Sequence, residues 1–176
     1  MGFEHPVTEL KHDHRLIEKV LSALERKLAG AEEFPSEFAA QALAFFAEFA
    51  DGHHHFREEE VLFPALAASG VSVESGPIGV MLHEHTLGRK LLAGIRENLE
   101  GARKGDGGAQ TAVRSYAAQY IELLRGHIWK EDNILFAMAE RVLDNEAVRA
   151  VAARFQAGGG TDPAVTERHA AFAAAL

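Results

Sequence analysis

One short motif, a histidine followed four residues later by a glutamate, occurs twice in this chain among similar neighbours. The copies read HFREEEVLF over residues 55–63 and HIWKEDNILF over residues 127–136. On an α-helix, side chains four residues apart lie on one face, so His55 with Glu59, and His127 with Glu131, each direct an imidazole and a carboxylate to one point. This spacing is typical of metal ligands.

A single histidine on an apolar helix precedes each copy of the motif. His14 follows Asp13, and His85 follows Glu84 in the same way. His14 lies 71 residues before His85, and each motif residue lies 72 residues before its counterpart. A nearly constant offset indicates two related halves, each with one helix carrying a single histidine and one carrying the motif. Folded face to face, the halves bring together four imidazoles and two carboxylates.

Composition narrows the class of protein. The chain has 176 residues, enough for one domain with its own core, and it has no cysteine, which excludes disulfides and thiolate metal sites. Its net charge of −8 disfavours nucleic acid and anionic membranes as partners. No apolar run approaches the roughly 20 residues of a membrane-spanning helix, and the N-terminus lacks a signal pattern, so we expect a soluble, cytoplasmic protein.

Apolar residues recur at spacings of three and four along most of the chain, and no alternating strand pattern is sustained. This pattern predicts an all-α fold, an antiparallel (up-down) four-helix bundle with a short extra C-terminal helix. The bundle domain is expected over residues 1–157, followed by a tail over residues 158–176 that is either docked or mobile. The expected helices are Pro6–Gly30, Ser36–Ala67, Pro77–Gly101, Ala109–Leu143 and Asn145–Gln156.

The second helix offers two registers for its ligands. His54 and Glu58 also have the spacing of the motif, but they lie about 100° around an α-helix from His55 and Glu59. We prefer His55 with Glu59 because this pair lies nearer the aromatic stripe and because Glu59 matches Glu131 in the repeat. His53, His54 and Glu58 are then expected on a solvated or outer face.

A buried polar network without metal is the plainer interpretation of these residues. Two carboxylates on inward-facing stripes have no basic partner on the same stripes, and an unpaired buried carboxylate is costly, which favours a metal. Four basic residues could in principle serve as ion-pair partners: Arg57, Arg89, Arg125 and Lys130.

The donor types favour iron, with manganese or zinc as weaker alternatives. Imidazole and carboxylate without thiolate suit all three metals, but zinc is usually held by three or four ligands around one ion. Six ligands, including two carboxylates able to bridge, are better matched to two ions in a bundle core. The sequence therefore predicts two iron ions with six metal ligands: His14, His55, Glu59, His85, His127 and Glu131.

Over residues 5–143 the chain resembles the hemerythrin-like, His-His-Glu cation-binding family of four-helix bundles. The resemblance is carried by the two motifs, Asp13-His14, the segment 76–81 (GPIGVM), and Glu84-His85 followed by Gly88-Arg89. It implies a non-haem, oxo-bridged di-iron centre. The implied bridging ligands are Glu59 and Glu131, and the implied terminal ligands are His14, His55, His85 and His127.

The sequence also departs from the oxygen-carrying hemerythrins. These proteins have a second histidine one turn before the histidine on the third helix, where this chain has Met81. They also end with a histidine and an aspartate five residues apart, whereas His127 and Glu131 are four apart. A missing ligand leaves a coordination position for water, an external ligand or a tyrosine, with Tyr120 or Tyr116 as candidates.

These departures weaken the inference that the protein transports oxygen. They make the chain more similar to the bacterial and iron-sensing members of the family. Three functions stay open. The first is a di-iron protein that binds or reacts with O2, peroxide or NO in sensing, storage or detoxification. The second is a di-iron oxidoreductase with catalase- or peroxidase-like activity, favoured by the missing ligand and by Trp129, Tyr116 and Tyr120. The third is an iron-responsive or structural metal-binding module with a protein partner.

Overall fold

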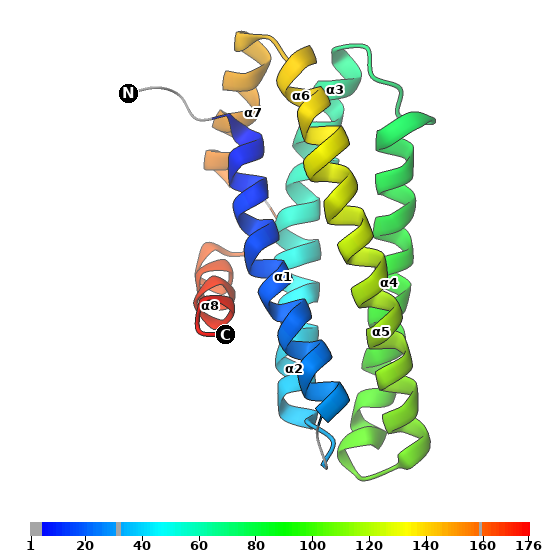
Figure 1. Ribbon diagram of the computed structural model, residues 1–176. Helices are drawn as coiled ribbons and strands as arrows, with labels where there is room; N and C mark the ends of the chain where they lie inside the picture. Colours follow the sequence, from blue (N-terminus) through cyan, green and yellow to red (C-terminus); the bar gives the residue numbers. More distant parts are fainter. Residues whose placement is uncertain (1–4, 31–32, 159) are drawn as a thin grey trace.

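The computed structural model describes residues 5–30, 33–158 and 160–176 of the chain. Over this part the chain is helical and has no strand, and four long rods lie side by side (Figure 1). The rods are α1 (Pro6–Gly30); α2 (Ser36–Phe45) continued by η1 (Phe46–His55), η2 (Glu58–Leu62) and α3 (Phe63–Ala68); α4 (Gly76–Arg103); and α5 (Gly107–Lys130) continued by η3 (Glu131–Leu135) and α6 (Phe136–Val142).

Successive rods run in opposite directions, because each is joined to the next by a short connection at one end of the bundle (Figure 1). The predicted all-α, up-down four-helix bundle is therefore confirmed, and helix ends agree with expectation to within about two residues. Two shorter helices follow, α7 (Asn145–Ala157) and α8 (Pro163–Ala174). None of the described helices combines the length and apolar composition that crossing a bilayer requires.

Three of the helices begin at an aspartate that caps their free backbone N–H groups. The Asp106 carboxylate accepts from two N–H groups at the start of α5, Asp144 does the same for α7, and Asp162 accepts one bond at the start of α8. A side-chain cap of this kind typically stabilises a helix by about 1 kcal/mol. These caps fix where the chain re-enters helix after each connection.

Segments η1, η2 and η3 are π-helical, which the sequence analysis did not anticipate. The N–H groups of Phe56, Phe63 and Phe136 donate to carbonyls five residues earlier, including those of Glu58 and Glu131. A turn closed over five residues is wider than an α-turn, so neighbouring side chains are rotated less from one another around the axis. Such segments are frequent at functional sites, and these three lie in the two rods that carry the motif.

The apolar core is divided into two clusters. One contains Leu21, Phe45 and Tyr120 and occupies the half of the bundle near the α4–α5 connection, whereas the other contains Leu62 and Phe136 and lies toward the opposite end. Each long rod contributes to both clusters. The histidines and glutamates singled out above occur between these contributions in each rod, so the bundle places them together in its middle.

The C-terminal tail, for which the sequence left two arrangements open, is docked along α1 and η1 (Figure 1). Ala173 is fully buried, and the Phe172 ring packs against Phe38. The Thr161 hydroxyl donates to the Glu48 carbonyl oxygen at 2.7 Å, and a ring nitrogen of His169 lies 2.8 Å from the Glu48 carboxylate. The tail thus covers the outer side of the π-helical segment η1. The domain boundary at residue 157 stays a prediction.

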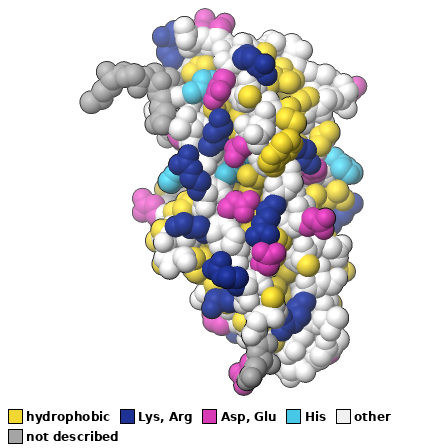
Figure 2. Space-filling model, in the orientation of Figure 1, with side chains coloured by type: hydrophobic (Ala, Val, Ile, Leu, Met, Phe, Trp, Pro, Cys, Tyr) yellow, Lys and Arg dark blue, Asp and Glu magenta, His cyan; other side chains and the backbone are white. Residues whose placement is uncertain are grey.

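The visible face of the molecule mixes acidic and basic side chains (Figure 2). Blue and magenta groups alternate along the bundle without a large patch of one sign on that face. This mixture gives no electropositive track of the kind that binds a nucleic-acid backbone.

Candidate metal centre

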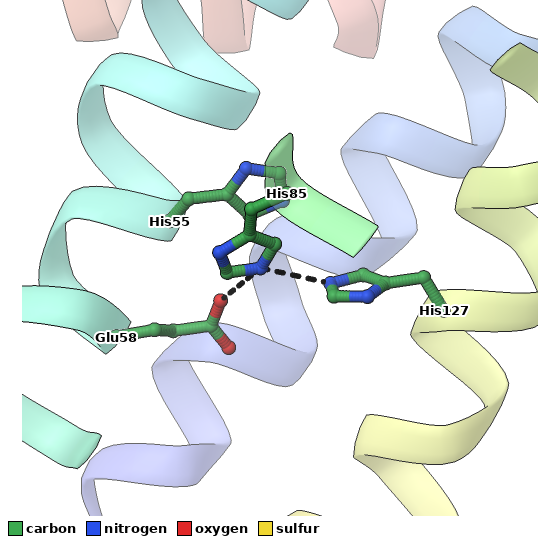
Figure 3. A group of neighbouring side chains, drawn as sticks. All are labelled: His55, Glu58, His85 and His127. Carbon is green, nitrogen blue, oxygen red and sulfur yellow. Dashed lines mark hydrogen bonds and ion pairs between the residues drawn. The ribbon is translucent and has the colours of Figure 1, made fainter. Parts of the chain in front are cut away.

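Seven buried side chains converge in the middle of the bundle as two adjoining groups. The three-histidine group consists of His55, Glu58, His85 and His127 (Figure 3), and the two-histidine group consists of His14, His54, Glu58 and Glu131. In each group the candidate ligand atoms all lie within 4.8 Å of one another. Every one of these residues is at most 5% exposed.

Nitrogen atoms approach one another closely in both groups. His85 Nε2 lies 3.1 Å from His127 Nε2, a contact marked by a dashed line in Figure 3, and His14 Nε2 lies 3.0 Å from His54 Nε2. The His55 ring stacks on His85 with 3.8 Å between centroids. Imidazoles with lone pairs directed at one point are arranged as they are around a cation.

The two glutamates connect the groups. Glu58 Oε2 lies 3.5 Å from His85 Nε2, and its Oε1 lies 3.7 Å from His54 Nε2. Glu131 Oε1 lies 3.2 Å from His127 Nε2, and its Oε2 lies 3.1 Å from His14 Nε2. Each carboxylate therefore directs one oxygen toward each group, which is the arrangement of a bridging ligand.

Every histidine of the site is oriented by an outer carboxylate that contacts its Nδ1. This contact leaves Nε2 free to face the centre and fixes the ring orientation, as carboxylate–histidine pairs do around metals. The five pairs are His14 with Asp132 (2.8 Å), His54 with Asp13 (3.2 Å), His55 with Asp51 (3.2 Å), His85 with Glu59 (2.6 Å) and His127 with Glu84 (3.0 Å).

Three cations in turn hold four of the outer carboxylates. Arg57 binds Asp13 in a short ion pair, and Lys130 binds Glu84 in the same way. Arg89 contacts Asp51 and Glu59, each at 2.8 Å. The shell around the histidines is therefore itself fixed by ion pairs, which limits the movement of the ligand set.

Burial and neighbouring charges shift the pKa of the carboxylates and imidazoles at the centre. Burial raises the pKa of Glu58 well above its usual range, and the neighbouring Glu131 carboxylate raises it further. Burial also disfavours charge on Glu131, but the imidazoles of His127 and His14 lower its pKa well below the usual value. Burial lowers the pKa of His54 and His55, which favours the neutral, metal-binding form of these rings.

Three carboxylate oxygens at the centre have no hydrogen-bond partner. They are both oxygens of Glu58 and Oε1 of Glu131, all buried. A buried polar atom without a partner costs about 1–3 kcal/mol, and more if charged, so three in one place call for a cation. Imidazole nitrogens and carboxylate oxygens are donors that iron accepts well. The residues therefore fit a metal site.

The structure corrects the predicted register of the second rod. Glu58 is fully buried between the groups, whereas Glu59, expected as a ligand, contacts His85 Nδ1 and Arg89 from outside. His54, expected on an outer face, is 1% exposed and belongs to the two-histidine group together with His14. The reason is the π-helical winding of η1 and η2, because its wider turn lets the consecutive His54 and His55 both face inward.

One signal in the sequence favours the observed register. Leu62-Phe63 and Leu135-Phe136 are separated by 73 residues, and the same offset relates Glu58 to Glu131 and His54 to His127. In both rods the glutamate opens a π-helical segment, and the Leu-Phe pair falls at its end. The Leu-Phe pair aligns the two halves of the repeat in a single way, whereas the three consecutive glutamates allow three different alignments with Glu131.

The expected ligand gap at Met81 is also corrected. Met81 is 2% exposed and packs in the apolar cluster with Leu62 and Phe136. The three-histidine group is formed by His55, His85 and His127 without it, and the histidine that the structure adds to the predicted set is His54, also from η1. Of the aromatic residues considered, Tyr120 is buried and lines a small cavity beside His55, whereas Trp129 is exposed.

Introducing a histidine at position 81 is expected to destabilise the protein without adding a ligand. Met81→His buries an imidazole among aliphatic side chains, which lowers the free energy of unfolding of the metal-free protein by about 1–3 kcal/mol. Met81→Leu, a volume-conserving control, costs less than about 1.5 kcal/mol. Denaturant unfolding and metal content of both variants check this, and tighter iron binding by Met81→His would contradict it.

The chain matches the family described as hemerythrin HHE cation-binding domain over residues 5–139. Because this match covers most of the chain, the protein belongs to that family, and the resemblance seen in the sequence is confirmed. The class defined by the fold and site is thus that of helical bundles that bind cations through histidine and glutamate. No solved structure gives a significant match to this chain.

Several curated relatives are similar to the chain. The iron-sulfur cluster repair protein DnrN of Neisseria gonorrhoeae is 32% identical over 149 residues, which cover 81% of this chain and 90% of that protein. The iron-sulfur cluster repair proteins YtfE of Pectobacterium carotovorum subsp. carotovorum (strain PC1) and of Yersinia pseudotuberculosis serotype O:1b are 30% and 31% identical over 135 residues. These cover 74% of this chain but only 60% of each YtfE protein.

Proposed function

We propose that this chain holds two iron ions and takes part in restoring iron–sulfur clusters damaged by nitric oxide or oxidants. The relatives that share its fold are named for iron–sulfur cluster repair, and DnrN is matched along nearly its whole length. The chain spans about 60% of the YtfE relatives, so any function of their remaining part lies outside this proposal. We infer that it works in the cytoplasm.

The observation that carries the proposal is the pair of shared carboxylates. Glu58 and Glu131 each direct one oxygen to the two-histidine group and the other to the three-histidine group. A single ion would leave one group of buried donors without a partner, whereas two ions satisfy both. The assigned ligands are three histidines on one ion, two on the other, and two bridging glutamates: His55, His85, His127, His14, His54, Glu58 and Glu131.

When bound, the iron pair supplies redox chemistry toward small ligands such as NO, O2 or peroxide and a store of iron atoms. The protein supplies position and insulation. Five outer carboxylates hold the imidazoles in one tautomer, with Nε2 toward the centre. The apolar clusters on both sides of the site exclude bulk water, so that donors and ions interact in a low-dielectric setting.

Metal analysis followed by a repair assay tests the proposal. The protein is loaded anaerobically with Fe2+, desalted and analysed, with two irons per chain expected. It is then added to a [4Fe–4S] dehydratase that has been inactivated by NO, and recovery of activity is compared with that given by free Fe2+ at equal concentration. Recovery no better than with free iron overturns the repair function.

Consumption of peroxide by the loaded protein tests the alternative oxidoreductase function. The missing ligand had favoured this alternative, but His54 raises the number of candidate protein ligands from six to seven, so we expect little turnover. Sustained peroxide consumption, with no repair of the dehydratase, would favour the oxidoreductase instead. A content near one metal per chain, or zinc in preference to iron, would favour a structural metal module.

A further inference from the structure

The five outer carboxylates are not equivalent. Asp13, Asp51, Glu59 and Glu84 are each held by an arginine or lysine, whereas Asp132 has no such partner among the described residues. Within residues 5–30, 33–158 and 160–176, its one ion-pair contact is His14 Nδ1 at 2.8 Å. Over this same part of the chain, His14 with Asp132 is therefore the one histidine–carboxylate pair of the site whose carboxylate has no arginine or lysine partner.

Asp132 is also the most accessible of the five. Its side chain is 36% exposed, compared with 26% for Asp51, 22% for Glu59, 13% for Glu84 and 10% for Asp13. Asp132 thus touches solvent on one side and a buried candidate ligand on the other. Since His14 belongs to the two-histidine group, Asp132 is the outer carboxylate beside the group that has fewer imidazoles.

The other outer carboxylates lie behind positive charge. Arg57 covers Asp13 and is itself held over the Phe155 ring at 4.8 Å, Arg89 covers both Asp51 and Glu59, and Lys130 covers Glu84. A divalent cation approaching any of these four carboxylates meets a fixed positive group first. An approaching cation meets at Asp132 a carboxylate that no arginine or lysine among the described residues covers, which favours the cation.

We propose that Asp132 is the carboxylate through which a divalent metal ion passes to and from the two-histidine group, so that the ion next to His14 is the exchangeable one. This inference rests on the proposed function and specifies which iron is transferred. The step would be ligand exchange: the Asp132 carboxylate would replace a water on the arriving ion, with that water released to solvent, and the residues that would then hold the ion are His14, His54 and the two glutamates. No electron or covalent bond is transferred.

The first test follows metal uptake by the full-length, metal-free protein. Co2+ is the probe, because its visible absorption reports binding directly in a stopped-flow instrument. Asp132→Asn removes a negative charge a few ångströms from the path of a divalent ion, so uptake slows by about tenfold at low ionic strength, and the difference shrinks as salt is added. Asp51→Asn is the matched loss of an outer carboxylate that Arg89 covers, and any slowing that it causes is smaller than that in Asp132→Asn and does not depend on salt.

The second test adds the missing cation. Trp129 lies three residues before Asp132 on the same rod and is 60% exposed, so its replacement faces the same side of the helix. Trp129→Arg places a guanidinium beside Asp132 and slows uptake, and it also slows release of the first of two Fe2+ to a ferrous chelator. Trp129→Gln, which removes the indole without adding charge, leaves both rates unchanged.

The outcomes separate this inference from the proposed function. Equal rates in Trp129→Arg and Trp129→Gln, or equal slowing in Asp132→Asn and Asp51→Asn, overturn the Asp132 path even if two ions bind. Failure of the unmodified protein to bind two ions would contradict the proposed di-iron centre itself. A salt-dependent slowing confined to Asp132→Asn and Trp129→Arg, with two ions bound at equilibrium, is the result expected.

Discussion

Glu58→Ala is expected to eliminate the two-ion site, whereas Glu59→Ala is expected to retain both ions. Glu58 is the carboxylate shared by the two groups, and its removal leaves Glu131 alone to serve two ions. Glu59 contacts His85 only through Nδ1, and loss of an outer partner of this kind lowers metal affinity by about 10–100-fold without removing a ligand. Metal content after loading with excess iron and desalting distinguishes the variants.

Thermal unfolding gives a second measurement for the same pair. A ligand present at about 100 times its dissociation constant stabilises the native state by roughly 2.7 kcal/mol. This increment, seen on adding Fe2+, should be largely lost in Glu58→Ala, whereas Glu59→Ala, with its affinity lowered about 10–100-fold, should keep about 0.4–1.4 kcal/mol of it at the same Fe2+ concentration. The reverse pattern would restore the α-helical register in which Glu59 faces the bundle axis.

His54→Ala and His55→Ala are expected to impair different ions. His54 belongs to the two-histidine group and His55 to the three-histidine group, so each variant loses one ligand from one ion. Iron content should fall from two toward one in both, with an affinity loss at the weakened group of more than about 100-fold, beyond that of an outer partner.

The neighbouring His53 provides the control for this pair. It is absent from both groups, and His53→Ala should bind two ions as the unmodified protein does. The assignment of both His54 and His55 as metal ligands is contradicted if His54→Ala also keeps its full iron content and an unchanged affinity. Iron-57 Mössbauer spectra of loaded variants would show which of two iron environments changes in each case.

Most of the fold could be predicted from the sequence because it follows from local patterns. Spacings of three and four place apolar stripes on four long helices, and glycine and proline mark their ends. His14, His85, His127 and Glu131 were predicted from the same reasoning, and the structure brings them together. His14, His85 and His127 lie in α-helical segments, and Glu131 follows directly on the α-helical turn that carries His127.

The ligand set of the second rod could not be derived in this way. A π-helical turn depends on hydrogen bonds to the carbonyl five residues earlier, and no residue type signals it as glycine signals a turn. A rotation of about 100° per residue holds only for an α-helix. Applied to a π-helical segment, it predicts that Glu59 faces inward and His54 outward, which is the opposite of the structure. The gap at Met81 was inferred by counting the ligands on each helix separately. In the structure the second rod supplies two consecutive histidines to the site, so the number of ligands on one helix does not decide whether the site is complete.

The shell of outer carboxylates has a consequence for the charge state of the centre. Two inner and five outer carboxylates, against Arg57, Arg89 and Lys130, leave a net charge of −4 when the histidines are neutral. In the proposed di-iron centre, two divalent ions would neutralise that charge, and two trivalent ions would exceed it by two. Oxidation of such a pair would therefore be coupled to the arrival of anions or the departure of protons, and acidity and anion supply should shift its reduction potential.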